Sequence, residues 1–183
     1  YKSEAVPEHQ KLKDTLANIP KNDMSDEEYM SNFKAGQQNR QGGIHNALAK
    51  SVLSPTQITH LIDHGNEGSM HDIANRKDLS DIHIQQLANT SNMIVHHHLL
   101  SNPEISNDNF NTIVKKAHPE NVPKIIGHAK FNETHIDNVL NKKISKADLT
   151  PILHRFPDKL EPHHISAIID KGDNGTHRIL VNK

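Results

Sequence analysis

Hydrophobic residues recur along this chain with a period of 26 residues. The segments that begin at Leu53, Leu79 and Ile105 are each 26 residues long, and the next begins on schedule at Phe131. Apolar residues lie five, eight and nine positions into these segments, at Ile58, Leu61 and Ile62; Ile84, Leu87 and Ala88; Phe110, Ile113 and Val114; and Ile136, Val139 and Leu140. A second apolar pair lies 20 and 21 positions in, at Ile73-Ala74, Leu99-Leu100 and Ile125-Ile126. Self-similarity of this length is typical of stacked repeats.

Each repeat predicts two short helices. The spacing of Ile58, Leu61 and Ile62 places them on one helix face, and the later apolar pair belongs to a second, weaker helix. Helices of two to three turns are marginal alone in water, so their stability must come from stacking on neighbouring repeats. We therefore expect the repeats to fold together.

The first helix carries signals for its own start and end. Ser54 is expected as the N-cap, Pro55 at the first helical position and Gln57 where a capping box closes. Ser80, Ser106 and Asn132 can cap the later repeats. Gly65 is expected to end the helix in the left-handed conformation. Pro151 would break a helix interior, so we expect the helix start to shift there.

The two ends of the chain depart from the pattern. Residues 1–23 are predicted to form an N-terminal arm or linker, in which Leu12, Leu16 and Ile19 can make one short helix face. A degraded repeat with a polar loop over residues 36–43 follows and is expected to act as an N-terminal cap. No polar capping helix closes the last repeat, so its final face should be exposed or covered by something outside this sequence, in a longer chain or a docked partner.

These patterns predict an all-α fold, a right-handed α-solenoid of short helix pairs over residues 24–183. The expected repeats are residues 24–52, 53–78, 79–104, 105–130, 131–159 and 160–183. The helix pairs, with boundaries such as residues 101–106 and His118-Pro119, resemble HEAT-like and leucine-rich-repeat-variant α-solenoids. The resemblance implies a curved stack used for binding, and it carries over no catalytic residue.

The composition excludes several kinds of site and function. The chain has 21 basic and 22 acidic residues, no cysteine and no tryptophan. Disulfides and thiolate zinc sites are therefore excluded, and no apolar segment approaches the length of a spanning helix. We expect no membrane association, and a cytoplasmic or virion-associated location. The Lys- and Asn-rich composition suits a phage or mobile-element protein.

Two groups of polar residues are candidate contact surfaces. A polar column lies four residues into the repeats, at Gln57, His83, Asn109, His135 and His164. These side chains could form an interaction strip that responds to pH, or simply cap each helix at its third position. Lysines form a candidate basic patch at Lys115, Lys116, Lys142 and Lys143, with Lys171 in a similar place; a solvated face is the alternative.

Sixteen histidines are the compositional oddity. His60 and His64 have the i, i+4 spacing that can bind zinc if a third ligand arrives, whereas two solvent-facing polar residues are the simpler interpretation. The consecutive His96, His97 and His98 project in different directions on a helix and cannot all face one ion. The sequence therefore predicts no metal site and no cofactor.

No enzyme motif stands out, because a cysteine nucleophile, a G-x-S-x-G motif and a P-loop are all missing. HEAT-like alkylpurine DNA glycosylases have the same type of fold, but they depend on aromatic residues and a basic concave face. We expect a non-enzymatic helical-repeat scaffold for protein-protein interaction or assembly. The alternative is a nucleic-acid-binding α-solenoid, whose affinity would fall steeply with salt.

Overall fold

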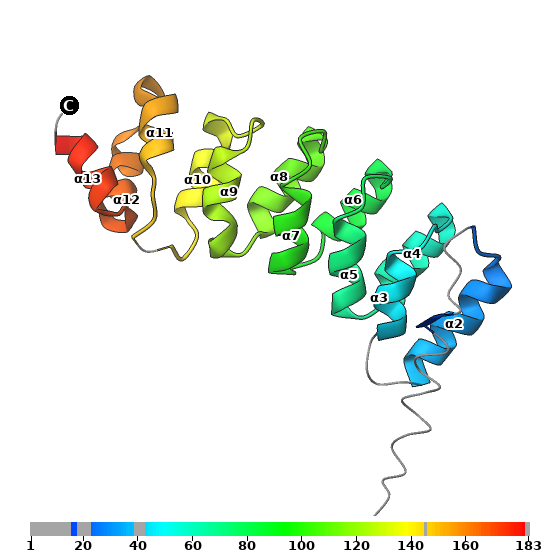
Figure 1. Ribbon diagram of the computed structural model, residues 1–183. Coiled ribbons are helices and arrows are strands. Elements are labelled where there is room, and N and C mark those ends of the chain that lie inside the picture. The colour runs from blue at the N-terminus through cyan, green and yellow to red at the C-terminus, as the bar shows by residue number, and fades with distance from the viewer. Residues whose placement is uncertain (1–15, 18–22, 39–42, 145, 182–183) are drawn as a thin grey trace, which may run out of the picture. The chain divides into compact units, whose positions relative to one another are not determined.

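The computed structural model describes residues 16–17, 23–38, 43–144 and 146–181, and this part of the chain is all-α (Figure 1). In the described residues no strand forms, and one isolated bridge joins Ala147 to Gly172. None of the described helices has the length and apolar character needed to cross a bilayer. The chain divides into two compact units, residues 1–87 and 88–183.

The helices are short and follow the predicted pairs. Their bounds are α2 Asp26–Gln38, α3 Gly43–Ala49, α4 Pro55–His64, α5 Glu67–Ala74, α6 Asp81–Ala88, α7 Met93–Leu99, α8 Asn107–Lys116, α9 Val122–Gly127, α10 Ile136–Leu140, α11 Thr150–Arg155, α12 Pro162–Lys171 and α13 Asn174–Val181. The 3-10 turns η1 Pro119–Asn121, η2 Glu133–His135 and η3 Pro157–Lys159 precede α9, α10 and α12.

In the N-terminal unit, α3 lies at the centre of the packing. It contacts α2, α4 and α5, and α4 also packs on α5. The core holds the apolar faces of these helices, and α2 adds Tyr29 and Phe33, whose rings stack with centroids 6.0 Å apart. Two aromatic residues thus supply the large apolar area that a short helix pair otherwise lacks.

In the C-terminal unit, alternate helices contact one another. The first helices of successive repeats meet, α8 with α10 and α10 with α12. The second helices also meet, α9 with α11 and α11 with α13, while η1 contacts both α7 and α9. The predicted apolar positions from Ile105 to Leu153 are buried between these helices. Each helix therefore buries its apolar face against its counterpart one repeat away.

The predicted N-caps are confirmed. Ser54 accepts a hydrogen bond from the backbone N–H of Gln57, and Ser106 caps α8 in the same way. Asn132 caps the turn η2 and accepts the N–H of Thr134. Pro151 lies in the first turn of α11, so the predicted shift of the helix start is also confirmed.

The predicted conformation of Gly65 is wrong. Its φ of −72° and ψ of 176° are extended, and Gly172 in the last repeat has nearly the same angles. Glycine is needed there for space instead. A Cβ at Gly65 would lie 2.3 Å from the carbonyl oxygen of Leu61 and 2.4 Å from Oγ of Ser69. The following helix therefore starts too close to the preceding one for any side chain.

The N-terminal region differs from its prediction in one respect. Helix α2 continues to Gln38, so the polar loop expected over residues 36–43 begins at least three residues later. Of the predicted arm, only residues 16, 17 and 23 belong to the described part of the chain; Leu12 and Ile19 lie outside it.

Candidate functional site

The predicted polar strip is buried. Gln57, His83, Asn109, His135 and His164 each expose 7% or less of their surface. Each occupies the third position of its helix or turn, and four of the side chains accept the backbone N–H of the N-cap residue: Gln57, His83, His135 and His164. This is the capping geometry that the sequence left open as the alternative. Little of these side chains is left for a partner.

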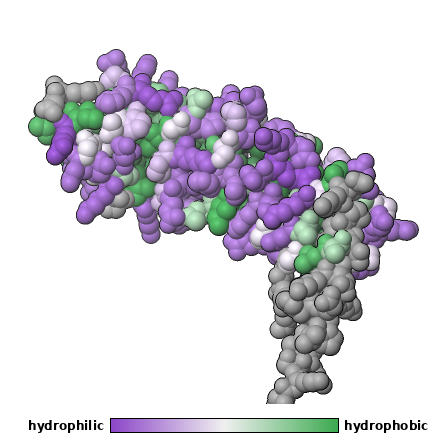
Figure 2. Space-filling model, in the orientation of Figure 1, coloured by the Kyte–Doolittle hydropathy of each residue, from purple (hydrophilic) through white to green (hydrophobic). Residues whose placement is uncertain are grey.

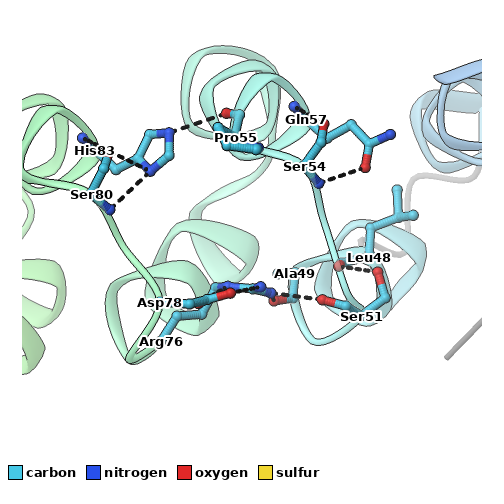
Figure 3. Close-up of polar contacts among 10 residues, drawn as sticks. All are labelled: Leu48, Ala49, Ser51, Ser54, Pro55, Gln57, Arg76, Asp78, Ser80 and His83. Carbon is cyan, nitrogen blue, oxygen red and sulfur yellow. Dashed lines mark hydrogen bonds and ion pairs between the residues drawn. The ribbon is translucent and has the colours of Figure 1, made fainter. Parts of the chain in front are cut away.

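The strip also joins consecutive repeats. Oε1 of Gln57 accepts a hydrogen bond from the N–H of Ser54 (Figure 3). Nε2 of Gln57 donates to the carbonyl oxygen of Met24 at 3.0 Å. The imidazole ring of His83 makes the corresponding two contacts. Its Nδ1 accepts from the N–H of Ser80, and its Nε2 lies 3.1 Å from the carbonyl oxygen of Pro55. One side chain thus caps its own helix and bonds to the preceding repeat.

Capping also fixes the tautomer of these histidines. In His135, Nδ1 accepts the N–H of Asn132, so the proton of the neutral ring must sit on Nε2, which donates to Oδ1 of Asn111 at 2.6 Å. Burial lowers the pKa of His135 below its ordinary value, with the charge of Glu133 acting in the opposite direction. The ring is therefore neutral around pH 7.

Two of the four lysines in the predicted basic patch bond to the backbone. Nζ of Lys116 donates to the carbonyl oxygen of Asn89 at 2.8 Å, and Nζ of Lys142 donates to that of Ala117 at 2.8 Å. Burial lowers the pKa of Lys142. Lys115 and Lys143 are exposed. Lys171 repeats the pattern, donating to the carbonyl oxygens of Leu140 and Lys142.

Basic residues in or just after the second helices have the same role, although the sequence pattern did not mark them as functional. Nη1 of Arg76 donates to the carbonyl oxygens of Ala49 and Ser51 at 2.9 and 2.8 Å (Figure 3). Nη2 and Nε of Arg76 donate to the carboxylate of Asp78 at 2.6 and 2.9 Å. Lys124 and Arg155 bond to the carbonyl oxygens of His97 and Ile126 in the preceding repeats in the same way. Each cation satisfies carbonyl groups that the end of a short helix leaves free.

Two of the histidines that the sequence offered as possible metal ligands, His60 and His96, have structural contacts. Nδ1 of His60 lies 3.0 Å from the hydroxyl of Tyr29, and its ring packs edge-on against Phe33. His64 is exposed beside it. His96 is fully buried with Nε2 3.0 Å from the carbonyl oxygen of Ala88, whereas His97 points to solvent.

A different cluster brings metal-ligating groups together. Nε2 of His163 and Nε2 of His164 lie 3.1 and 3.0 Å from the same oxygen, Oδ1 of Asp137. Hydrogen bonds from His163 lower the pKa of Asp137. In the described residues this is the one group of three such side chains whose ligand atoms converge. Its signal in the sequence is the His163-His164 pair, which follows Asp137 by about one repeat.

The last helix pair exposes apolar side chains. The position nine residues into each repeat is buried at Ile62, Ala88, Val114 and Leu140, but Ile169 in α12 is 55% exposed. Val181 at the end of α13 is 85% exposed. Hydrophilic residues cover much of the visible surface in Figure 2, and a hydrophobic area appears at the α12–α13 end. We call Ile169, Val181 and the half-buried Ile165, Ile179 and Leu180 the end face.

No family model, curated protein or solved structure matches this chain.

Proposed function

We propose that this protein is a non-enzymatic helical-repeat scaffold, a right-handed α-solenoid of about 26 residues per repeat, that binds a protein partner through its end face. The periodic hydrogen bonds support the repeat architecture. Gln57, His83, His135 and His164 each bond to a residue 24 to 33 positions earlier, and the basic residues bond to carbonyl groups 24 to 31 positions earlier. Bonds at one repeat's separation fix the register between neighbours.

The exposure of Ile169 is the observation that supports partner binding. In the earlier repeats the side chain at the same position is buried. Burying a large aliphatic side chain stabilises a complex by roughly 1.5–3 kcal/mol relative to leaving it exposed. Ile169 and Val181 thus lack the apolar contact that holds the other repeats together.

The partner that fits this face is an amphipathic helix or helix pair. Within the chain, such faces are covered by short helices whose apolar residues have i, i+3, i+4 spacing. The polar groups near helix ends are already bonded, as with Thr176, which accepts from the N–H of Leu149 and donates to Asp173. Shape and apolar contact, rather than charge, would therefore select the partner.

The nucleic-acid alternative has less support. A phosphate track needs free cationic groups, and the ammonium groups of Lys116 and Lys142 are directed at backbone carbonyls. Lys115 and Lys143 remain as exposed cations in a chain with a formal charge of −1.

Site-specific photo-crosslinking tests the proposal. A photoreactive phenylalanine analogue at position 169 should capture one defined protein in extracts of the source cells, and Val181→Asp should abolish the adduct. The same analogue at the exposed His154 on α11 is the control and should not capture that protein. Absence of an adduct at position 169, or identical adducts at both positions, would refute the proposal.

A further inference from the structure

The side chains of Asp137, His163 and His164 meet across two consecutive repeats. His163 and His164 lie in the first turn of α12, and Asp137 lies in α10 of the preceding repeat, which α12 contacts. The two Nε2 atoms approach one carboxylate oxygen at 3.1 and 3.0 Å, and the three ligand atoms lie within 4.8 Å of one another. We propose that this cluster binds a divalent transition-metal ion, with Zn²⁺ the ion that its ligands suit best.

Two of the three separations between the ligand atoms match a tetrahedral site. Zinc lies about 2.0–2.1 Å from histidine nitrogen and about 2.0–2.2 Å from carboxylate oxygen, so neighbouring ligand atoms of a tetrahedral site are about 3.3 Å apart. The Nε2 to Oδ1 separations in the cluster are only a few tenths of an ångström shorter. Two imidazoles and a carboxylate leave the fourth position for water. Such a set favours zinc over calcium or magnesium, which prefer oxygen ligands.

The carboxylate of Glu161 lies near the second ring nitrogen of His163. Its Oε2 lies 3.5 Å from Nδ1 of His163, on the side of the ring away from Asp137. A ligating histidine usually donates its second N–H to a carboxylate in this way, which fixes the ring and makes it a better ligand. Glu161 and Asp137 also place two negative charges beside the ion. The three ligands and Glu161 then carry no net positive charge that would repel a cation.

Binding would change the proton on His164. In the metal-free protein Nδ1 of His164 accepts the N–H of Glu161, so the proton of the neutral ring is on Nε2. When Nε2 coordinates the ion, the proton of the neutral ring is on Nδ1, so Nδ1 no longer accepts the N–H of Glu161. The ion thus replaces the hydrogen bonds of His164 to Glu161 and Asp137 with coordinate bonds that still join the two repeats.

The site is open to solvent. Asp137 and His163 expose 63% and 59% of their side chains, while His164 exposes 9% and anchors the cluster. An ion can enter without any opening of the fold. Because the ligands come from two repeats, bound metal would raise the thermal stability of the C-terminal unit by mass action. This inference is independent of the proposed partner binding at the end face.

Titration of the full chain with Zn²⁺ after treatment with a chelator tests the site. Calorimetry should detect one ion that His163→Ala, Asp137→Asn and His164→Gln each weaken by about tenfold or more. His164→Gln keeps a capping acceptor, as Gln57 shows in an earlier repeat, so it should fold. His154→Ala, in an exposed histidine of α11, should bind the ion like the wild type.

The spectrum of bound Co²⁺ gives an independent readout. Wild type should show the intense visible absorption of a tetrahedral site, and Asp137→Asn should lose it. Zn²⁺ should also raise the melting temperature of wild type and not that of His163→Ala. The proposal is overturned if Asp137→Asn and His163→Ala bind Zn²⁺ like the wild type, or if wild type gains neither the cobalt spectrum nor thermal stability.

Discussion

Nζ of Lys142 donates a hydrogen bond of 2.8 Å to the carbonyl oxygen of Ala117, the residue that ends helix α8 one repeat earlier. The same ammonium group lies 3.2 Å from the carbonyl oxygen of Lys115. A lysine that looks like part of a basic patch in the sequence thus closes the end of a neighbouring helix. Arg76 and Arg155 do the same for the second helices.

Replacement of Lys142 should therefore cost stability. Lys142→Met keeps the aliphatic stem but loses the charged donor, and should lower the free energy of unfolding by about 1–3 kcal/mol. Urea denaturation measures the change. The adjacent Lys143→Met is the matched control, because an exposed side chain should change stability by less than about 0.5 kcal/mol. Equal effects of the two substitutions would contradict the assigned role.

The capping histidines should tolerate glutamine better than an apolar residue. His135→Gln can accept the N–H of Asn132 and donate to Asn111, as Gln57 does in its own repeat. His135→Leu leaves both groups without their partner and should lower the free energy of unfolding by about 1–3 kcal/mol. Denaturant curves of the two variants should differ by most of that amount. A larger loss in the glutamine variant would argue against the capping role.

Stability should decline in mild acid. Burial lowers the pKa of His96, His128 and His135 below the ordinary 6.5. Above 6.5 the rings are neutral in both states, so their contribution to stability is complete. As the pH falls below 6.5 the unfolded chain takes up protons that the folded chain does not, and stability is lost until the lower folded pKa values are passed.

Urea midpoints between pH 7.5 and 5 measure this decline. His135→Gln should reduce its slope, because one titrating group is removed. His154→Ala, in an exposed histidine, should leave the slope unchanged. A flat profile in the wild type over this range would show that the buried rings accept protons as readily as exposed ones do.

Two glycines should respond oppositely to alanine. At Gly65 a Cβ would lie 2.3 Å from a backbone oxygen, so Gly65→Ala should destabilise the protein by about 1–3 kcal/mol. At Gly127 no atom lies within 4 Å of the added Cβ. Gly127→Ala should be neutral, or stabilising by up to about 1 kcal/mol, because alanine restricts the unfolded chain. Thermal melts of the pair provide the comparison.

Adjacent isoleucines in α12 should separate core from surface. Ile168 is fully buried, and Ile168→Ala should cost about 2–5 kcal/mol. Ile169→Ser removes an exposed side chain and should change the free energy of unfolding by about 0.5 kcal/mol or less. Chemical denaturation tests both. A large loss at position 169 would mean that the end face is covered within the chain itself.

The sequence predicted the local structure well because helix signals are local. Apolar spacing located α4, α6, α8 and α10, and the serine caps located the first turns of α4, α6 and α8. The conformation of Gly65 was predicted wrongly, since its constraint is a close approach to Ser69 and Leu61 rather than a positive φ. Such a contact has no local signature.

The bonds between repeats were harder to predict. The acceptors of Lys142 and Arg76 are backbone carbonyls, which every residue possesses, so nothing in the sequence marks them. The convergence of Asp137 with His163 depends on the register between α10 and α12. The expected absence of enzyme activity, the phage or mobile-element origin and the cytoplasmic or virion-associated location stay predictions.

The native mass of the protein in its source cells tests directly whether the end face binds a protein partner. Tagged wild type and Ile169→Asp would be compared by size-exclusion chromatography with light scattering, after circular dichroism confirms that both are folded. If a partner binds the end face, the wild type should elute in a complex well above the 20.6 kDa of the chain, and Ile169→Asp should elute alone. A wild type that elutes as a free monomer, or a complex that Ile169→Asp leaves intact, would contradict it.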